Sequence, residues 1–193
     1  MEQKQLKGLL AVAGLSILIA CGGGSGGIAT ETTSAELLSG CLSTLTGGGT
    51  TVTASDSGCP NCSVSDAANS IDTSNQTFSG LNFDVAGGQL SLSAKAQEGV
   101  VFPAGNYAGV YVFFPKIDGS GYSSISVNIK TYLEGNVQQT VYTDTTNIGN
   151  LLDSGSDAFF GDTTSAPFDQ VEIEVNASGA ESTIRVYDFC ADN

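Results

Sequence analysis

The run Ile125-Ser126-Val127-Asn128-Ile129-Lys130-Thr131-Tyr132 alternates apolar and polar side chains along most of its length. Successive side chains of a strand point to opposite faces, so this pattern predicts a strand with one face in a core and the other in water. Glu134-Gly135-Asn136 then supplies turn residues, and Val137 to Tyr142 returns as a second strand. The stretch therefore predicts an antiparallel hairpin.

The same kind of short strand recurs on both sides of this hairpin. Leu90 to Ala94 alternates, Val171 to Val175 places three branched residues on one face, and Thr183 to Tyr187 closes the set. The run from Tyr107 to Phe114 is more evenly apolar, which is typical of a central strand buried on both faces. No long helix separates these runs. The chain is therefore predicted to be all-β, an antiparallel β-sandwich.

The amino terminus has the pattern of an export signal. Lys4 and Lys7 precede an apolar stretch from Leu9 to Ala20, and the small residue Ala20 comes just before Cys21. The stretch is shorter than the roughly 20 apolar residues that a spanning helix needs. The alternative is an ordinary signal peptide that a cysteine follows by chance.

Leu18-Ile19-Ala20-Cys21 resembles the lipobox of bacterial lipoproteins. The resemblance implies cleavage before Cys21 and attachment of fatty acyl chains, such as palmitate, to that residue. Two or three acyl chains hold a protein on a membrane without a spanning helix. Gly22 stands where the inner-membrane retention signal typically has Asp, so the resemblance implies an outer-membrane address. Whether the domain faces the periplasm or the cell surface stays open.

The composition excludes several classes of function. Six Lys and Arg oppose 20 Asp and Glu, for a net charge of −14, so phosphate backbones are repelled and nucleic acid is not an expected partner. The chain has no histidine, which removes the commonest general base and the Ser-His-Asp arrangement. We therefore expect a protein that is not an enzyme.

Apart from Cys21, the cysteines are Cys41, Cys59, Cys62 and Cys190, an even number that predicts two disulfides in an exported domain. We favour Cys62–Cys190, which would tie the two ends of the domain, together with Cys41–Cys59. Cys59-Pro60-Asn61-Cys62 has the spacing of a thioredoxin-type motif. The helix that such redox activity requires is not predicted after it.

These signals divide the chain into a signal peptide (1–20), a flexible Gly/Ser-rich tether (21–32), a helix with a connecting segment (33–61) and the β-sandwich domain (62–193). Thr33 and Glu36 form a capping box, and apolar residues recur at helical spacing up to Leu45, which predicts a short helix from Ser34 to Leu45. The alternative for this segment is an extension of the tether.

The segment Ala68-Asn69-Ser70-Ile71-Asp72-Thr73-Ser74-Asn75-Gln76-Thr77-Phe78 resembles the opening of discoidin-type, galactose-binding-like jelly rolls, which include family-32 carbohydrate-binding modules. The ending Ile184-Arg185-Val186-Tyr187, with Cys190 nearby, resembles theirs as well. The resemblance implies a jelly-roll fold over about residues 62–190. Thr73 replaces the family's turn glycine, Phe78 replaces its usual tryptophan, and its tryptophan and arginine motifs are absent.

In that family the first turn commonly helps to hold a structural calcium ion. The resemblance makes Asp72 and Asn75 candidate calcium ligands, since Ca²⁺ takes oxygen ligands. The alternative is that both residues form Asx-type turns. Asp153-Ser154-Gly155-Ser156-Asp157 is a further oxygen-rich loop, for which turn chemistry is the simpler explanation.

Sugar recognition requires exposed aromatic rings with converging polar groups. Tyr122 and Tyr142, in or beside predicted loops, are the candidate ligand-binding residues, and Tyr122 is the one expected to be more exposed. Phe159-Phe160 is expected to be core, split between two faces of a strand. We predict an extracytoplasmic binding or adhesion module with a glycan as first candidate ligand.

The alternative is an accessory subunit of an outer-membrane or envelope assembly. Such a subunit would dock on its protein partner through an apolar patch near Phe113-Phe114. An enzyme that uses carboxylates such as Asp153 and Asp157 ranks well below both.

Overall fold

The computed structural model describes residues 44–46, 49–74, 76–116, 122–144 and 155–192, all of which belong to the unit Thr32–Asn193. Cys21, Cys41 and most of the helix expected from Ser34 lie outside the described residues. Among the residues described, no helix has both the length and the apolar character needed to cross a bilayer.

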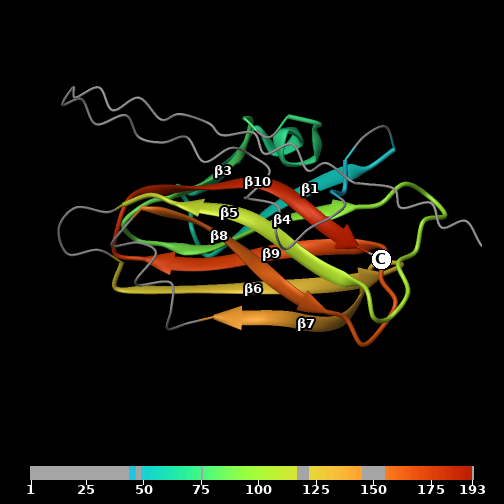
Figure 1. The fold of residues 1–193 in the computed structure, drawn as a ribbon. Helices are drawn as coiled ribbons and strands as arrows, with labels where there is room; N and C mark the ends of the chain where they lie inside the picture. Colours follow the sequence, from blue (N-terminus) through green and yellow to red (C-terminus); the bar gives the residue numbers. More distant parts are fainter. Residues whose placement is uncertain (1–43, 47–48, 75, 117–121, 145–154, 193) are drawn as a thin grey trace, which may run out of the picture. The chain divides into compact units, whose positions relative to one another are not determined.

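Two five-stranded antiparallel sheets make up this unit (Figure 1). The first has the order β1-β4-β9-β6-β7 and the second the order β2-β3-β10-β5-β8. The elements are β1 (Thr51–Ser57), β2 (Ser63–Ser65), the 3-10 helix η1 (Ala67–Ile71), β3 (Ser79–Phe83), β4 (Gly88–Lys95), β5 (Tyr107–Phe114), β6 (Ser124–Leu133), β7 (Asn136–Asp144), β8 (Ser156–Thr163), β9 (Gln170–Ser178) and β10 (Ser182–Asp192).

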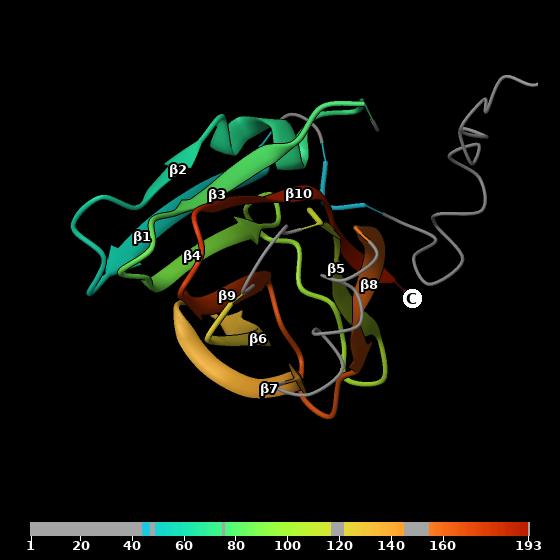
Figure 2. The same cartoon turned by 90° about the vertical axis from the view of Figure 1, so that its left-hand side faces the viewer.

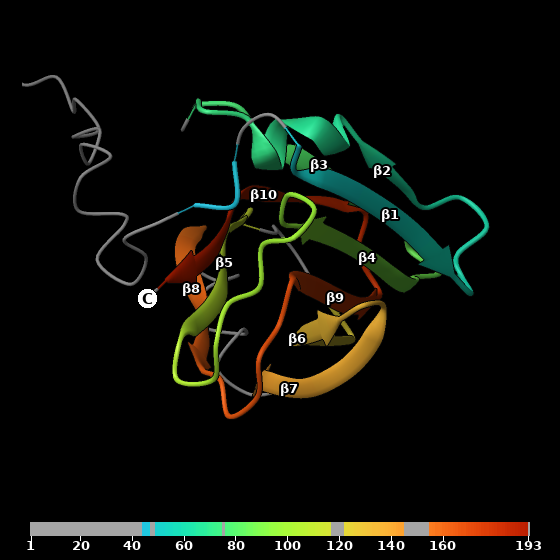
Figure 3. The ribbon, with the colours of Figure 1, turned by 90° about the vertical axis from the view of Figure 1, so that its right-hand side faces the viewer.

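The two sheets stack face to face, as the end views show (Figures 2 and 3). Their inner faces meet in one core whose branched and aromatic side chains are fully buried: Leu90, Leu92, Val110, Val112, Phe114, Ile129, Ile173, Ile184 and Phe189. Alternate residues of each strand supply these side chains, as the period-two pattern requires. The predicted antiparallel β-sandwich of jelly-roll type is confirmed.

The expected hairpin is β6–β7, closed by Glu134 and Gly135 between the paired residues Leu133 and Asn136. Both loop residues have positive φ angles, 51° and 79°. Two consecutive positive φ values are the mark of a type I′ turn, whose twist suits an antiparallel pair. The sequence therefore located this turn correctly.

Strand β1 was not expected. It pairs with β4 along its whole length, from Thr51 opposite Lys95 to Ser57 opposite Gln89, and lies at the edge of the first sheet. Nearly all its residues are exposed, so it lacks an apolar face that would reveal it. The sandwich consequently begins at Thr51, earlier than the boundary at residue 62 expected from the sequence.

The residues just before β1 contact the last strand. Thr44 forms a β-bridge with Cys190, and the Leu45 amide donates to the Phe189 carbonyl at 2.7 Å. The Leu45 side chain is buried in the core. Thr44 and Leu45 are thus paired with β10, whereas the sequence placed them at the end of a helix.

The disulfide pairing favoured from the sequence is wrong. Cys59 is bonded to Cys62, with Cα atoms 5.2 Å apart. Cys190 is also disulfide-bonded, so Cys62 is not its partner. The observed pairing has a local cause. The Cys62 amide donates to the Cys59 carbonyl, and this tight turn brings the two side chains together.

Candidate functional site

The outer face of the first sheet carries polar groups that satisfy one another. Glu174 on β9 accepts hydrogen bonds from Gln89 (2.6 Å), Asn128 (3.0 Å) and Lys130 (2.6 Å). The Tyr132 hydroxyl donates to Glu172 at 2.7 Å. Cross-strand pairs of this kind stabilise a sheet. The described residues of this face therefore leave few polar groups free to bind a ligand.

The outer face of the second sheet is aromatic instead. Alternating with the core residues Val110 and Val112, β5 presents its other side chains outward, and β8 and β10 do the same. We call this group the aromatic strip. Its members are Phe78, Tyr107, Tyr111, Phe113, Phe159 and Tyr187.

The rings of the strip contact one another across strands. Ring centroids lie 6.0 Å apart for Phe78 and Tyr187, 5.5 Å for Tyr111 and Tyr187, and 5.5 Å for Tyr107 and Phe159. Tyr111 is buried, and the other five rings are half-buried, with part of each in solvent. Aromatic pairs at 4.5–7 Å attract each other beyond their burial, so the strip is an ordered surface.

A bulge in β10 places one of these rings. The register with β5 runs from Val186 opposite Val112 to Asp188 opposite Tyr111, which leaves Tyr187 as the extra residue. A bulge re-aims the side chain at the inserted position. Tyr187 therefore contacts rings on both neighbouring strands, Phe78 before β3 and Tyr111 on β5.

Gly109 makes room for another ring. A Cβ atom built at this position collides with the Phe159 ring, which lies over the glycine backbone. The Phe159 ring from the neighbouring strand β8 thus packs directly on the backbone of β5 at Gly109. This position is one where only glycine fits.

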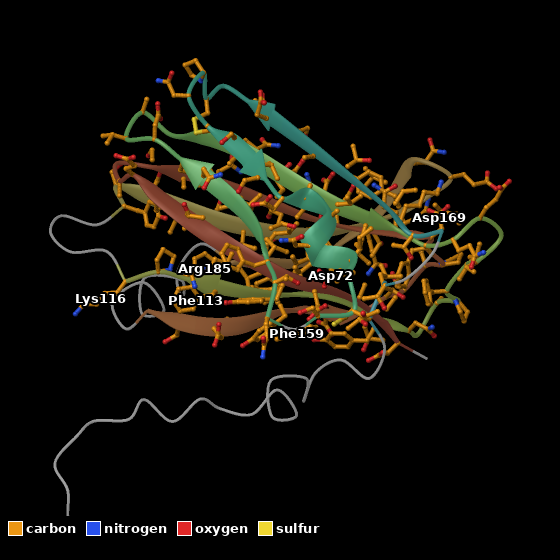
Figure 4. The ribbon with its side chains drawn as sticks, turned by 90° about the horizontal axis from the view of Figure 1, so that it is seen from above. Asp72, Phe113, Lys116, Phe159, Asp169 and Arg185 are labelled. Carbon is orange, nitrogen blue, oxygen red and sulfur yellow. A yellow bond between two sulfur atoms is a disulfide. The ribbon has the colours of Figure 1, made fainter. Side chains whose placement is uncertain are left out.

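Arg185 places a positive charge on this face. Its guanidinium carbon lies 4.8 Å from the centroid of Phe78 and 5.2 Å from that of Phe113, within the range of cation–π attraction. The side chain is exposed. Figure 4 shows Arg185 and Phe113 close together toward the end of the sandwich opposite Asp169, with Phe159 nearer the middle.

A pair of carboxylates adjoins the strip. Asp188 on β10 is buried, and burial together with the charge of Asp72 raises its pKa to about 6. Asp72, just after η1, accepts hydrogen bonds from the Ser74 amide (2.7 Å) and the Thr77 hydroxyl (2.6 Å). The expected Asx-type turn is therefore present at Asp72, whereas Asn75 lies outside the described residues.

This donor set suits a calcium ion in its chemistry. Two carboxylates that repel each other in a buried place gain from a divalent cation, and oxygen is the atom that Ca²⁺ prefers. Asp188 was missed from the sequence. The sequence feature that could have revealed it is an acidic residue within the otherwise apolar run Val186–Phe189. The bulge turns this residue away from the core.

The two tyrosines predicted to bind ligand lie elsewhere. Tyr122 is half-buried, packs against the core and forms a hydrogen bond between its hydroxyl and that of Ser182. Tyr142 packs against Phe160, with ring centroids 5.1 Å apart. Tyr122 is thus less exposed than expected. Phe159 and Phe160 point to opposite faces of β8, as expected, but only Phe160 is in the core; Phe159 lies in the strip, contrary to the expectation that both are core.

A hollow of about 630 Å³ lies at the end of the first sheet. It is lined by Lys95, Glu98, Glu134 and Asp169 among others, and Lys95 and Asp169 form an ion pair at 3.3 Å. No aromatic ring is among the described residues that line it. It therefore lacks the stacking surface that a sugar requires.

Two further groups of polar residues are less suited to chemistry. Cys59, Cys62 and Asp84 lie within 4.8 Å of one another, but disulfide sulfurs cannot act as thiolate ligands. A hydrogen bond from Asn61 lowers the pKa of Asp84. Of the carboxylates considered for catalysis, Asp157 is exposed opposite Phe113 and Asp153 lies outside the described residues.

No protein-family model matches the chain, and no curated protein matches its sequence. Among solved structures, it resembles tailspike protein 4 of bacteriophage CBA120 (TM-score 0.44, 12% identity, 75% of this chain and 19% of that one). It also resembles the Clostridium perfringens module CpGH89CBM32-5, solved with GalNAc-β-1,3-galactose (TM-score 0.42, 14% identity, 75% and 99%). A third is TmCBM61, solved with β-1,4-galactotriose (TM-score 0.37, 14% identity, 72% and 86%). These are distant likenesses.

Proposed function

We propose that this protein is a carbohydrate-binding or adhesion module whose aromatic strip binds a glycan. The observation that carries the proposal is a row of half-buried rings on one outer face of the sandwich, next to an exposed arginine. The C–H faces of sugars stack on aromatic rings, and a few polar groups then fix their orientation.

The test is a glycan array probed with the domain that starts at Thr32. We expect binding to at least one class of glycan, with a loss of about 10-fold or more for Phe113→Ala or Phe159→Ala, since removal of a side chain that anchors a ligand costs about 2 kcal/mol. Tyr132→Ala is the matched control, because it removes an aromatic ring from the outer face of the other sheet.

A blank array would count against glycan binding. The strip would then be the docking face of an accessory subunit in an envelope assembly, and the same Phe113→Ala variant should lose its protein partner in co-purification. Phe114, the other half of the expected docking patch, is fully buried, so it offers no surface to a partner.

We further propose that Cys21 carries the lipid anchor and that the domain functions outside the cytoplasm at the outer membrane. The support is the lipobox-like run before Cys21 and the glycine-rich tether after it. Cys21→Ser should abolish labelling by a fatty-acid analogue and leave the precursor uncleaved. Normal maturation of that variant would contradict the proposal.

We also propose that Asp72 and Asp188 hold a calcium ion, with Asn75 as a further ligand from the sequence. The support is the paired carboxylates, one of them buried. Millimolar Ca²⁺ should raise the melting temperature of the wild type, because a ligand that binds the folded state stabilises it. The shift should vanish in Asp188→Asn and persist in Asp84→Asn. An equal shift in Asp188→Asn would assign the ion elsewhere.

A further inference from the structure

The cationic side chains among the described residues fall into two groups, those in ion pairs and those without one. Lys95 pairs with Asp169 at 3.3 Å, and Lys130 pairs with Glu174 at 2.6 Å. Lys116 and Arg185 are exposed, and neither forms an ion pair with any residue that the structure describes. These two cations lie toward the same end of the second sheet in Figure 4, where Phe113 lies between their labels and Asp169 lies at the far end.

The side chain of Arg185 is restricted by its neighbours, and its N–H groups are available to a ligand. Its guanidinium carbon lies over the rings of Phe78 and Phe113, and these contacts restrict the side chain. A guanidinium carries five N–H donors in a fixed planar fork. No described residue accepts a hydrogen bond from them. A planar fork of free donors matches a carboxylate in two-point geometry.

We infer that the glycan bound by the aromatic strip is acidic, of the uronic acid class, and that Arg185 binds its carboxylate. This inference rests on the proposed glycan-binding function and names the substrate class of that same site. The rings of the strip stack on the sugar, while Arg185 selects for the charged group. Lys116 adds a second positive charge at the same end of the sheet.

The surrounding charge limits where the acid can lie. The net charge of −14 repels a polyanion from most of the surface, and Asp157 stands opposite Phe113 on β8. Asp72 and Asp188 lie beyond Tyr187 on the same face. The carboxylate therefore binds beside Arg185, on the side away from Asp157. Because charges on the surface are screened beyond about 8–10 Å at moderate salt, these distant acids weaken binding most at low ionic strength.

The test compares a galacturonate oligosaccharide with a neutral galactose oligosaccharide of equal length by titration calorimetry. The wild type should bind the acidic ligand at least about 10-fold more tightly, as expected of hydrogen bonds between charged groups. Arg185→Gln should lose this preference and bind the acidic and the neutral ligand within about 3-fold of each other. Arg185→Lys should fall between the two, because an ammonium lacks the fork.

Lys95→Gln is the matched control, since it removes the same charge at the far end of the sandwich. If the wild type binds both ligands equally, or only the neutral one, with Phe113→Ala reducing that binding, the inference fails and the proposed function stands. If neither ligand nor any glycan on the array binds, both fail. A preference for the acid that Arg185→Gln leaves intact would also overturn the inference.

Discussion

Glu134 and Gly135, the two residues between β6 and β7, both have positive φ angles. Glycine adopts this conformation without strain, but an L-residue with a long side chain in it is destabilised by about 1 kcal/mol. Glu134 is exposed, and the hydrogen bond from its backbone N–H to Asp169 does not depend on its side chain. The position therefore tolerates residues that suit a type I′ turn better.

Glu134→Asn should stabilise the domain by about 1 kcal/mol, because Asn-Gly is the preferred pair for this turn. Urea unfolding of the two proteins at the same pH measures the difference. Equal midpoints would show that the turn does not have the strained conformation described.

Asp188 makes stability depend on pH. Its pKa is about 6 in the folded protein, against 3.8 for an ordinary Asp, so the folded state holds a proton that the unfolded state releases between these values. Its contribution to stability is complete below about pH 4 and is lost as the pH rises through 6. With calcium removed by EDTA, Asp188→Asn should be more stable than the wild type at pH 7, by up to about 3 kcal/mol.

This advantage should disappear near pH 4, where Asp188 in the wild type is already neutral. The free energies of unfolding at pH 4, 5.5 and 7 decide the point. A constant difference across this range would mean that Asp188 does not titrate as described.

At the scale of elements, the disulfides hold different parts of the fold. Cys59–Cys62 closes a short loop between β1 and β2, whereas Cys190 lies on β10, opposite Thr44. Cys41 precedes Thr44 by three residues, so we expect Cys41 to be the partner of Cys190. That bridge would tie the segment before Thr44 to the last strand.

Peptide mapping without reduction should recover Cys59–Cys62 and Cys41–Cys190. Cys59→Ser with Cys62→Ser should lower the free energy of unfolding by about 2 kcal/mol, because a loop this short restricts the unfolded chain little. Cys41→Ser with Cys190→Ser should cost more, since its loop is far longer. Recovery of Cys62–Cys190 would refute this pairing.

At the scale of the whole molecule, residues on the inner faces of the sandwich stabilise the fold, whereas residues of the aromatic strip on an outer face are available for binding. Phe113 and Phe114 are neighbours in the sequence but point to opposite faces of β5, one to the aromatic strip and one to the core. Phe114→Ala should cost about 3–5 kcal/mol of stability, as large-to-small changes in a core do. Phe113→Ala should cost much less stability and affect ligand binding instead. Urea unfolding and calorimetry of the two variants test this division.

Much of the fold followed from local patterns. Strands β4, β5, β6, β7, β9 and β10 contain the alternating or apolar runs that identify them, and the turn at Glu134-Gly135 has its own chemistry. The edge strands β1 and β2 were missed because exposed serine and threonine resemble a loop. They become strands through hydrogen bonds to β4 and β3, which no local pattern records.

The sequence by itself determined the class of fold. A strand that buries one face has alternating apolar and polar residues, and this pattern can be recognised locally. The tertiary structure alone decided the candidate site. Phe113 lies on β5, Arg185 and Tyr187 lie on β10, and Phe78 precedes β3; these residues meet only because β3, β10 and β5 are neighbours in one sheet. The bulge that turns Tyr187 and Asp188 outward depends on strand pairing, and pairing is a contact between distant segments.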